Sequence, residues 1–454
     1  MNRSRPPRAD GIPLLGNTVQ LAREQAALFE RLRDEYGDFV TISVAGFGEM
    51  TMVTDPEAVR DLLITNGDAF GKAELMRDRL GALLGDGLIL SEGERWRRQR
   101  TRMQPAFFRD QIASYAPAVV DQTEERLARW EPGEAYDLEE EMLMLTLDTL
   151  LRSLFGTDVA FEERGIRQAI RDLEKPGEPS NQVLARTVPK WVPIPLWRRY
   201  NAGIDTFEEF VQRLVDDEQA RLSTDDANPD DNMLSLLLTA TDDEGEPMPP
   251  GDIRDEMMTL LFAGHETTAT ALTFTWFSLA THPEVEEKFH TELDSVLGGD
   301  RPTMADLDDL EFTEAVFTEA MRLYPPIPVL PREATREVSV AGYDFEPGDV
   351  VVPVQWAIHR DPRWWDDPEE FRPERWLGEQ RERPRFAYFP FGGGPRKCIG
   401  EGFAMVEGQL VLATIGQRLR FGLRDDDLDP TTLDLSVDVT TRPQETIEVV
   451  PERR

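Results

Sequence analysis

Residues 391–400 read Phe-Gly-Gly-Gly-Pro-Arg-Lys-Cys-Ile-Gly and contain Cys398, the single cysteine of the chain. Glycines carry no Cβ, so the backbone of residues 392–394 can lie close to a flat ligand. Arg396 and Lys397, together with the N-terminus of a helix predicted to begin near Cys398, favour the thiolate form of the cysteine. A buried and unreactive thiol is the simpler alternative. The glycines, the two cations and the helix N-terminus favour a thiolate ligand over a core cysteine.

Other uses of this glycine-rich turn are excluded by spacing. No glycine is followed at the required distance by the Gly-Lys-Ser/Thr of a phosphate-binding loop. In a Gly-x-Gly-x-x-Gly frame starting at Gly392, the last position is Lys397. With one cysteine, the chain can form neither an intramolecular disulfide nor a four-thiolate zinc or iron–sulfur site.

The composition is that of a globular protein with a strongly acidic surface. The chain has 454 residues, of which 40% are hydrophobic, and its 87 acidic and 50 basic residues give a net charge of −37. Such a charge repels phosphate backbones, so nucleic acid is excluded as a partner. Five of the basic residues are lysine. An acidic surface poor in lysine suits a salt-rich cytoplasm, which predicts a halophilic host.

The sequence predicts a cytoplasmic protein without a transmembrane anchor. The first ten residues are rich in Arg and Pro, and no apolar run of the kind found in signal peptides follows them. The most apolar long segment, residues 257–280, carries His265 and Glu266 at its middle. A charge at the centre of a bilayer costs about 2.5–3.5 kcal/mol. We therefore expect this segment to be a helix buried in a large core.

The pattern of apolar residues predicts a mainly α fold with a small β portion, in one domain spanning residues 1–454. The clearest predicted helices are residues 21–36, 252–281 and 312–324. The predicted strands are residues 39–43 and 50–53, which form a hairpin, and residues 338–340, 343–345 and 350–354. Residues 189–197 are apolar, but their prolines argue against a helix.

The quoted stretch resembles the Phe-x-x-Gly-x-Arg-x-Cys-x-Gly haem-binding loop of the cytochrome P450 family. Every fixed position of that loop is filled, by Phe391, Gly394, Arg396, Cys398 and Gly400. The resemblance implies the cytochrome P450 fold over about residues 10–450 and haem b as the cofactor. It also implies that Cys398 is the axial ligand of the iron and that the loop residues Gly392 and Ile399 contact the haem.

Two further motifs follow in the order of that family. Glu319-Ala-Met-Arg322 is similar to its Glu-x-x-Arg motif, and residues 371–376 resemble the segment that supplies a second arginine, Arg375. Alone, an i,i+3 pair is common on solvated helices and contributes about 0.2–0.5 kcal/mol. In the family the carboxylate is buried between two arginines, so these residues are structural and substitution of Glu319 should destroy the fold. Trp376 stands where the family usually has Phe, a change expected to cost little.

The long predicted helix contains Ala263-Gly-His-Glu-Thr-Thr268. His265 and Glu266 begin the His-Glu-x-x-His pattern of zinc proteases, but the second histidine position is Ala269, which excludes zinc hydrolysis. The small Ala263 and Gly264 either leave room beside the helix for a flat macrocycle or serve a close helix–helix contact.

By resemblance to the oxygen-binding helix of cytochromes P450, Thr267 is the alcohol that hydrogen-bonds dioxygen in the distal pocket. Glu266 is then the acid that orients water and relays protons. Trp96-Arg-Arg-Gln-Arg100 resembles the family's Trp-x-x-x-Arg helix, which implies that Trp96 and Arg100 bind a haem propionate. Arg332 and Arg396 bind propionates by the same resemblance, although Arg332 by itself could equally be a solvated arginine.

The resemblance implies a monooxygenase that inserts one atom of dioxygen into a C–H or C=C bond of a hydrophobic substrate such as a fatty acid, carotenoid or terpenoid. The expected pocket residues are Leu83, Leu84, Leu88, Leu260, Ala263, Ile327, Val329 and Leu330. The apolar residues of Trp191–Trp197 lie where the family has a mobile lid. They either touch a membrane surface to collect a lipid or belong to the core.

No Rossmann or flavin fingerprint occurs in the sequence, so the electrons are expected from a separate carrier such as a ferredoxin. An arginine cluster could dock that carrier or pair with nearby acids; its members are Arg95, Arg97, Arg98, Arg100 and Arg102. Two other classes of protein remain open. One is a non-catalytic haem-thiolate sensor or carrier, and the other is a cofactor-free helical interaction protein.

Overall fold

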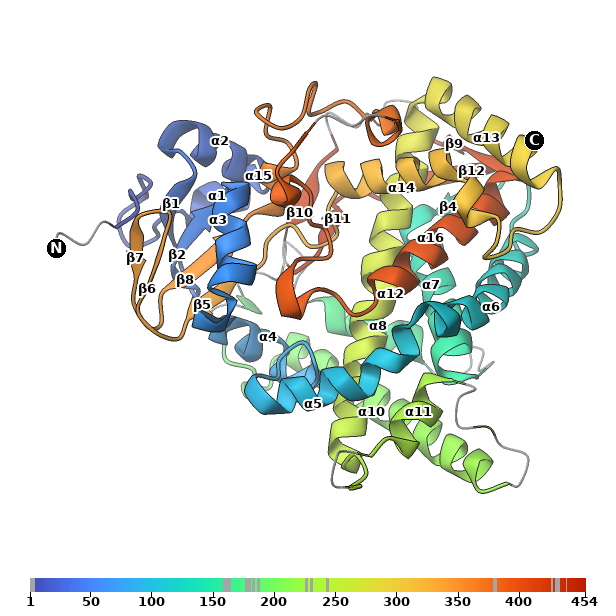
Figure 1. Cartoon of the computed structure of the whole chain (residues 1–454), viewed down its shortest axis with the longest axis horizontal. Coiled ribbons are helices and arrows are strands. Elements are labelled where there is room, and N and C mark those ends of the chain that lie inside the picture. Colours follow the sequence, from blue (N-terminus) through green and yellow to red (C-terminus); the bar gives the residue numbers. More distant parts are fainter. Residues whose placement is uncertain are drawn as a thin grey trace.

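The computed structural model describes residues 5–157, 165–175, 181, 184–185, 188–224, 228, 232–241, 245–378, 382–425, 428, 433–437 and 439–454. Within these ranges the chain is mainly helical with small sheets, as the sequence predicts (Figure 1). The helices are α1 (Thr18–Glu24), α2 (Ala27–Tyr36), α3 (Pro56–Arg60), α4 (Glu74–Leu84), α5 (Gly93–Met103), α6 (Arg109–Leu127), α7 (Leu138–Phe155), α8 (Ile166–Glu174), α10 (Pro195–Leu222), α11 (Met233–Thr239), α12 (Pro250–Thr281), α13 (Pro283–Leu297), α14 (Glu311–Leu323), α15 (Gln355–Ile358) and α16 (Glu401–Gly416). The strands are β1 (Phe39–Val44), β2 (Gly48–Val53), β3 (Phe70–Lys72), β4 (Tyr136–Asp137), β5 (Arg332–Ala334), β6 (Val338–Val340), β7 (Tyr343–Phe345), β8 (Val350–Pro353), β9 (Leu419–Leu423), β10 (Leu435–Val437), β11 (Thr441–Pro443) and β12 (Glu448–Arg453).

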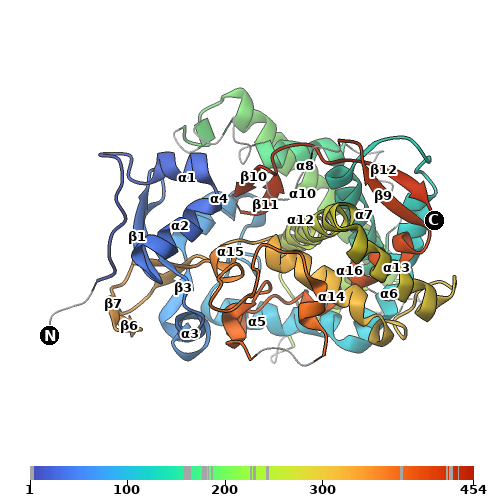
Figure 2. The same cartoon turned by 90° about the horizontal axis from the view of Figure 1, so that it is seen from above.

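Helix α12 runs through the middle of the molecule, and Figure 2 shows it nearly along its axis. It is apolar on almost every side and therefore buried over most of its length, with α7, α14, α10 and α16 packed around it. Its buried hydroxyls keep a hydrogen bond because they donate to carbonyls one turn back, as Thr273 does to Ala269 at 2.8 Å. The predicted buried helix is confirmed.

The β portion lies mostly at the end of the molecule that holds the N-terminus (Figure 1). Its main sheet has the strand order β1-β2-β8-β5-β3. Strands β1 and β2 form the predicted antiparallel hairpin, with Val40 opposite Met52. Strand β8 runs parallel to β2 and antiparallel to β5. Smaller sheets pair β6 with β7, β10 with β11, and β12 with both β4 and β9.

Three predicted elements differ from the structure. The helix expected over residues 21–36 is broken at Gln25, whose φ of 48° ends α1 before α2 begins. The last long helix begins at Glu401, three residues after Cys398. Helix α10 begins at Pro195, so the last three residues of the segment 189–197, for which no helix was predicted, are helical. Proline fits there because it occupies the first position of the helix.

None of the described helices combines the length and the apolarity needed to cross a bilayer.

Candidate active site

The cysteine loop has a backbone geometry that its glycines allow. Gly392 and Gly394 have φ angles of 72° and 69°, in the left-handed region that favours glycine. A Cβ on Gly394 would also collide with the carbonyl oxygen of Leu63, so the loop packs directly on that backbone. The amide of Cys398 donates to the carbonyl oxygen of Phe391 at 2.9 Å and closes the loop. The cysteine is therefore held by main-chain contacts.

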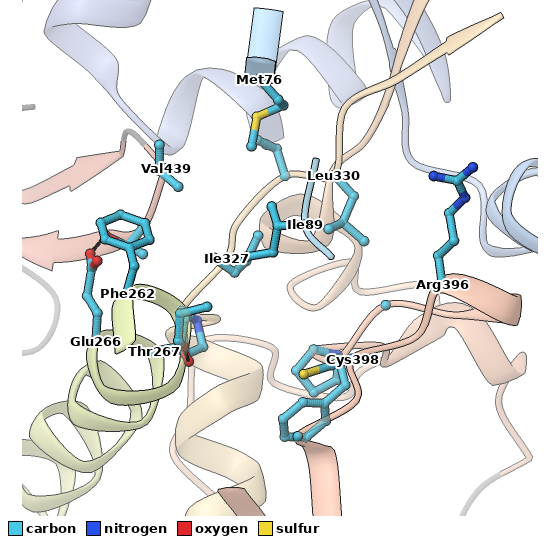
Figure 3. Close-up of a pocket in the computed structure, with 18 of the residues that line it drawn as sticks. Met76, Ile89, Phe262, Glu266, Thr267, Ile327, Leu330, Arg396, Cys398 and Val439 are labelled. Atoms are coloured by element: carbon cyan, nitrogen blue, oxygen red, sulfur yellow. Dashed lines mark hydrogen bonds between the residues drawn. The ribbon is translucent and has the colours of Figure 1, made fainter. Parts of the chain in front are cut away.

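The Cys398 side chain opens into the main cavity of the protein (Figure 3). Burial raises the pKa of its thiol, whereas the N–H groups of Gly400 and Glu401 and the charge of Arg100 act in the opposite direction. Burial outweighs these groups, so the pKa of the thiol is raised overall. Cys398 is thus a neutral thiol at neutral pH, and a bound metal ion would displace its proton.

The two basic residues expected to favour the thiolate have other partners. Arg396 donates to both carboxylate oxygens of Glu92, in one case at 2.6 Å, and Lys397 pairs with Glu401 at the start of α16. Each positive charge is therefore balanced locally. The expectation that these two residues favour the thiolate is wrong, and Arg100 is the cation that acts on the sulfur.

Helix α12 forms the wall of the cavity across from Cys398 (Figure 3). Ala263, Gly264 and Thr267 line this wall, and Thr267 Oγ1 donates to the carbonyl oxygen of Ala263 at 2.8 Å. Gly264 also serves helix packing, because a Cβ there would collide with Leu150 of α7. Both interpretations of the small residues therefore apply: they leave room in the cavity, and they allow a neighbouring helix to approach.

Positive side chains gather at one end of this cavity. Trp96 and Arg100 lie on α5, Arg332 begins β5, and Arg396 belongs to the cysteine loop; all four line the cavity. The Arg396 guanidinium lies 5.3 Å from the centre of the Trp96 ring. Burial lowers the pKa of Arg332 to about 10. The structure thus brings together the residues that the resemblance assigns to the propionates.

Lys72 belongs to the same cluster and was not expected from the sequence. It lies on β3, where it pairs with Arg332 of β5. Its ammonium donates to the carbonyl oxygen of Leu88 at 2.5 Å. Burial, with repulsion from Arg396, lowers its pKa to about 7. No local pattern marks Lys72, because its partner strand lies far away in the sequence.

Glu266 follows the cavity wall, but its carboxylate turns toward the C-terminal hairpin of β10 and β11 and away from Cys398 (Figure 3). Thr440 Oγ1 and Arg442 Nη2 both donate to its Oε1, each at 2.6 Å. Burial raises the pKa of this carboxyl, but Arg442 and the two hydrogen bonds outweigh it, and the pKa is lowered. Glu266 is therefore an ionised carboxylate. Its partner Arg442 carries no signal in the sequence, because the two meet only in the folded chain.

A second carboxyl beside α12 was also missed by the sequence analysis. Glu407 lies on α16, is 1% exposed and faces Thr268. Burial raises its pKa well above the ordinary range of a carboxyl and so favours the protonated form. A carboxyl within an otherwise apolar buried helix needs either such a neutral state or a partner. A Glu in the apolar interior of the α16 sequence is therefore a signal from which Glu407 could have been predicted.

Glu319 is fully buried and has more partners than the sequence predicts. Arg322 donates to it through Nε and Nη2, each at 2.9 Å, and Arg375 donates through Nε at 2.8 Å. The indole N–H of Trp376 donates as well, at 2.8 Å. Tryptophan is therefore no neutral replacement for phenylalanine here, because it supplies a hydrogen bond. The cluster ties α14 to the short helix Pro373–Trp376.

The rest of the cavity wall is mostly apolar, and the cavity has a volume of about 480 Å³. The predicted pocket residues that line it are Leu88, Leu260, Ala263, Ile327, Val329 and Leu330. The expectation is wrong for Leu83 and Leu84, which are buried at the end of α4, Leu83 against a separate small void. Met76, Ile89 and Phe262 line the cavity without having been expected (Figure 3).

The apolar segment before α10 is divided between surface and core. Trp191 is 82% exposed, whereas Leu196 and Trp197 are 7% and 2% exposed. Lys190 Nζ donates to two backbone carbonyls of α4, at 2.8 and 3.0 Å, and fixes the segment there. Any contact with a membrane surface would therefore use Trp191 and not Trp197, which is core.

Comparison with known proteins gives a consistent result. The Cytochrome P450 family matches residues 6–449 of this chain. Cyclooctatin synthase of Streptomyces melanosporofaciens is 36% identical over 412 residues, which cover 90% of this chain and 88% of the relative. Pentalenene oxygenase of Streptomyces avermitilis is 32% identical over 425 residues, covering 93% and 92%. The crystal structure of the cytochrome P450DA heme domain matches with a TM-score of 0.87 at 28% identity, covering 100% of this chain and 98% of that one.

The residues present fit a haem. The sulfur of Cys398 is a soft ligand that faces the cavity, and the glycines of its loop have no side chains that would keep a flat group away. The opposite wall contains the small residues Ala263 and Gly264. Glu92 already balances Arg396, and the other cations at the cavity end are Lys72, Arg100 and Arg332. They suit two carboxylates, since buried cations need anionic partners. Among the residues that the structure describes, no group of three or more His, Cys, Asp or Glu side chains offers another metal site.

Proposed function

This chain belongs to the cytochrome P450 family, and from that premise we propose that it acts on a terpenoid-like hydrophobic substrate with electrons from a ferredoxin. The enzyme is a cytochrome P450 monooxygenase with haem b as its cofactor. When bound, a haem with a thiolate ligand would supply dioxygen activation, in which one oxygen atom enters the substrate and the other leaves as water at the cost of two electrons and two protons. The observation that carries the proposal is one cavity that contains both the Cys398 thiol and an apolar wall.

We assign the chain's haem contacts to three parts of the cavity. Cys398 would ligate the iron, and its loop neighbours Phe391, Gly392, Ile399 and Gly400 would lie along the same side of the ring. The propionates would be held by the cation cluster, namely Lys72, Arg100, Arg332 and Arg396, together with the neighbouring Trp96. On the other side, Ala263 and Gly264 leave the space that the ring and a small ligand need.

Haem binding is expected to add a proton to Lys72. Without haem its pKa is about 7 because of burial, and propionate charges beside it would raise that pKa. At pH values between the two pKa values Lys72 holds one proton more in the loaded protein, so the contribution of Lys72 to haem affinity falls as pH rises above 7. The fall reaches about tenfold per pH unit. Titration of the apoprotein with haem from about pH 6 to about pH 9 measures it.

The control for this titration is the Lys72→Met variant. Haem binding also releases the Cys398 thiol proton, since that pKa is raised, and this release strengthens binding as pH rises. The informative quantity is therefore the ratio of wild-type to variant affinity. It should stay constant below pH 7 and fall above it. A ratio that does not change over the whole range would remove Lys72 from the propionate site.

We assign proton delivery to Thr267 and Glu266. Thr267 Oγ1 lies on the cavity wall, and its bond to the Ala263 carbonyl leaves its lone pairs free to accept a proton. Its own proton can pass into the cavity only when the hydroxyl rotates away from that carbonyl. Glu266 is ionised and one residue away, so it can take a proton from water and pass it on to Thr267 Oγ1. That transfer requires the carboxylate to turn away from the C-terminal hairpin.

Docking of the electron carrier is assigned to the exposed arginines of α5. Arg95 is paired with Asp86 and Asp252, and Arg100 lines the cavity. Arg97 and Arg98 remain at the surface, Arg97 beside Glu94. A small patch of this kind can attract an acidic carrier such as a ferredoxin, although the net charge of −37 repels it elsewhere.

The substrate class rests on the cavity and on the relatives. The wall around the expected substrate residues is mostly apolar, and the cavity volume of about 480 Å³ has to hold the haem as well as the substrate. The names of the two bacterial relatives, cyclooctatin synthase and pentalenene oxygenase, point to oxidation of cyclic terpenoids. A compact cyclic hydrocarbon is therefore favoured over a long fatty acid or carotenoid.

Binding of candidate substrates to the haem-loaded protein tests this proposal. Cyclic terpene hydrocarbons and alcohols should shift the haem spin state and then give substrate-dependent dioxygen uptake with a hydroxylated or epoxidised product. Fatty acids and carotenoids serve as the comparison. A spin-state shift with fatty acids or carotenoids, and none with the terpenes, would contradict the terpenoid class. A spin-state shift without any substrate-dependent dioxygen uptake would indicate a sensor or carrier.

We propose that the enzyme works in the cytoplasm of a salt-adapted cell, as one catalytic domain. With one cysteine the chain forms no intramolecular disulfide, which suits the reducing cytoplasm. High salt screens the repulsion that a net charge of −37 produces.

A further inference from the structure

The C-terminal hairpin reaches from near the end of the chain to the middle of α12. The amide and the hydroxyl of Thr441 donate to the carbonyl oxygens of Pro326 and Pro325, at 2.9 and 2.8 Å, and fix β11 to the end of α14. The next residue, Arg442, extends to Glu266. Figures 1 and 2 both place β10 and β11 beside α12. The hairpin is thus anchored on one side and bonded to the helix on the other.

The Glu266 carboxylate is charged because of this hairpin. Its side chain is 6% exposed, and the transfer of a carboxylate into such a site is costly unless a cation compensates it. In the described part of the chain the charged or titratable groups that face it are Arg442 of β11, His265 of α12 and, beyond Arg442, Glu139 of α7. Arg442 is the largest of the stabilising influences.

Arg442 lies between two carboxylates of different exposure. Its Nη2 is 2.6 Å from the buried Glu266, whereas its Nε is 4.0 Å from Glu139, whose side chain is 26% exposed. An arginine remains charged in either position. A small outward swing would therefore exchange an inner partner for an outer one without leaving the guanidinium uncompensated.

The hairpin tip also touches the cavity. Val439 and Thr440 line it, and Val439 lies above the Glu266 carboxylate in Figure 3. Thr440 is the residue whose hydroxyl binds that carboxylate. A substrate that presses on the tip therefore acts on the same short segment that holds Glu266.

We propose that Arg442 is a positioning residue that holds the Glu266 carboxylate against the hairpin until a substrate displaces the tip, and then releases it toward Thr267. This inference rests on the proposed proton delivery by Glu266 and Thr267. In the protein without substrate the carboxylate is turned away from the cavity, so protons are not delivered and dioxygen is not consumed wastefully. With substrate bound, Arg442 moves toward Glu139 and Glu266 is free to turn.

The first test measures product formed per dioxygen consumed, over a range of pH. In Arg442→Gln, Glu266 loses its cation, its pKa rises, and only the hydrogen bond from Thr440 still holds its orientation. We expect at least about a tenfold loss of product per dioxygen, faster dioxygen uptake without substrate, and an acid limb of the pH profile at higher pH. Arg442→Lys should restore most of the coupling, because it returns a cation.

The matched control is Arg420→Gln, which removes another ion-paired arginine of the C-terminal strands. Arg420 lies on β9, pairs with Glu452 at 2.8 Å and is 56% exposed. This variant should behave as the wild type. An Arg442→Gln enzyme with wild-type coupling and a wild-type pH profile would overturn the inference.

A second test does not depend on turnover. The pKa of the Glu266 carboxyl is lowered in the folded protein from its ordinary value of 4.5. Such a carboxyl stabilises the folded state at pH values above 4.5, and this contribution is lost as the pH falls through the lowered pKa. The melting temperature of Arg442→Gln should therefore fall several degrees below the wild type at pH 7 and approach it near pH 4. Adding Glu266→Gln should recover much of the loss at pH 7, since no buried charge remains.

The two tests separate this inference from the proposed function. A pH-independent gap in melting temperature, or no recovery in the double variant, contradicts the ion pair itself. A confirmed ion pair with unchanged coupling in Arg442→Gln contradicts the positioning role. A wild-type protein that forms no product with any candidate substrate contradicts the proposed function, and the melting experiment still decides whether Arg442 holds Glu266.

Discussion

Replacing Glu319 with glutamine is expected to lower the free energy of unfolding by about 3–5 kcal/mol and to leave little protein able to take up haem. The carboxylate is fully buried and accepts from Arg322, Arg375 and Trp376 at 2.8–2.9 Å. Glutamine is neutral, so it leaves two buried guanidinium groups without their counter-ion. Breaking a buried ion pair by removing one partner costs much more than the pair itself contributes.

Urea unfolding of the wild-type and variant apoproteins, with far-UV circular dichroism as the signal, measures this loss. Trp376→Phe is the matched control, because it removes one hydrogen bond to the same carboxylate and keeps all charges. A hydrogen bond to a charged group contributes about 1.5–3 kcal/mol, so this variant should unfold at a urea concentration between those of the wild type and Glu319→Gln. Equal stability of Glu319→Gln and the wild type would show that the buried charge is not structural.

Replacing Cys398 with alanine is expected to abolish product formation while the apoprotein remains folded. The thiol opens into the cavity, and its loop is held by main-chain bonds such as the one from the Cys398 amide to Phe391. Removing the sulfur therefore changes the free energy of unfolding of the apoprotein by no more than about 1 kcal/mol, as is usual for side chains outside the packed core. The activity disappears because no other residue of the loop can supply a thiolate.

Ile399→Val is the control for that variant. Ile399 lines the cavity beside the cysteine, and the change removes one methylene without touching the sulfur. Product formation should persist in this variant, and both apoproteins should melt close to the wild type. Residual turnover by Cys398→Ala at the wild-type rate would mean that the sulfur takes no part in the reaction.

The cysteine loop and the long helix could be predicted because each is contiguous in sequence. Residues 391–400 hold the ligand, the glycines and a cation in one stretch, and α12 holds Ala263, Gly264 and Thr267 on one helix. The structure brings these two segments to opposite walls of one cavity. Local patterns are therefore enough where one element carries the chemistry.

The remaining site residues depend on contacts between distant segments. Lys72 joins the cation cluster only because β3 pairs with β5, and Arg442 reaches Glu266 only because β11 folds back onto α12. Neither contact leaves a trace in the spacing of residues along the chain. Trp376 is a further case, since its role depends on where the indole N–H points.

Local electrostatics were also mispredicted for a physical reason. Arg396 and Lys397 stand next to Cys398 in the sequence, but Glu92 and Glu401 balance their charges in the fold. The break at Gln25 is similar, because a positive φ at a residue other than glycine has no sequence pattern. The residues next to one another in the sequence therefore show which side chains a site contains, but not its net charge, because the balancing groups can come from distant segments.

The absorption spectrum of the reduced, carbon monoxide-bound protein tests the central claim most directly. A thiolate ligand moves the Soret band of that complex to longer wavelength than a neutral ligand does, so the spectrum reports on the sulfur itself. We expect the long-wavelength band in the wild type and in Ile399→Val, and its loss in Cys398→Ala. A wild-type protein that binds haem without this band, or an alanine variant that keeps it, would contradict thiolate ligation by Cys398.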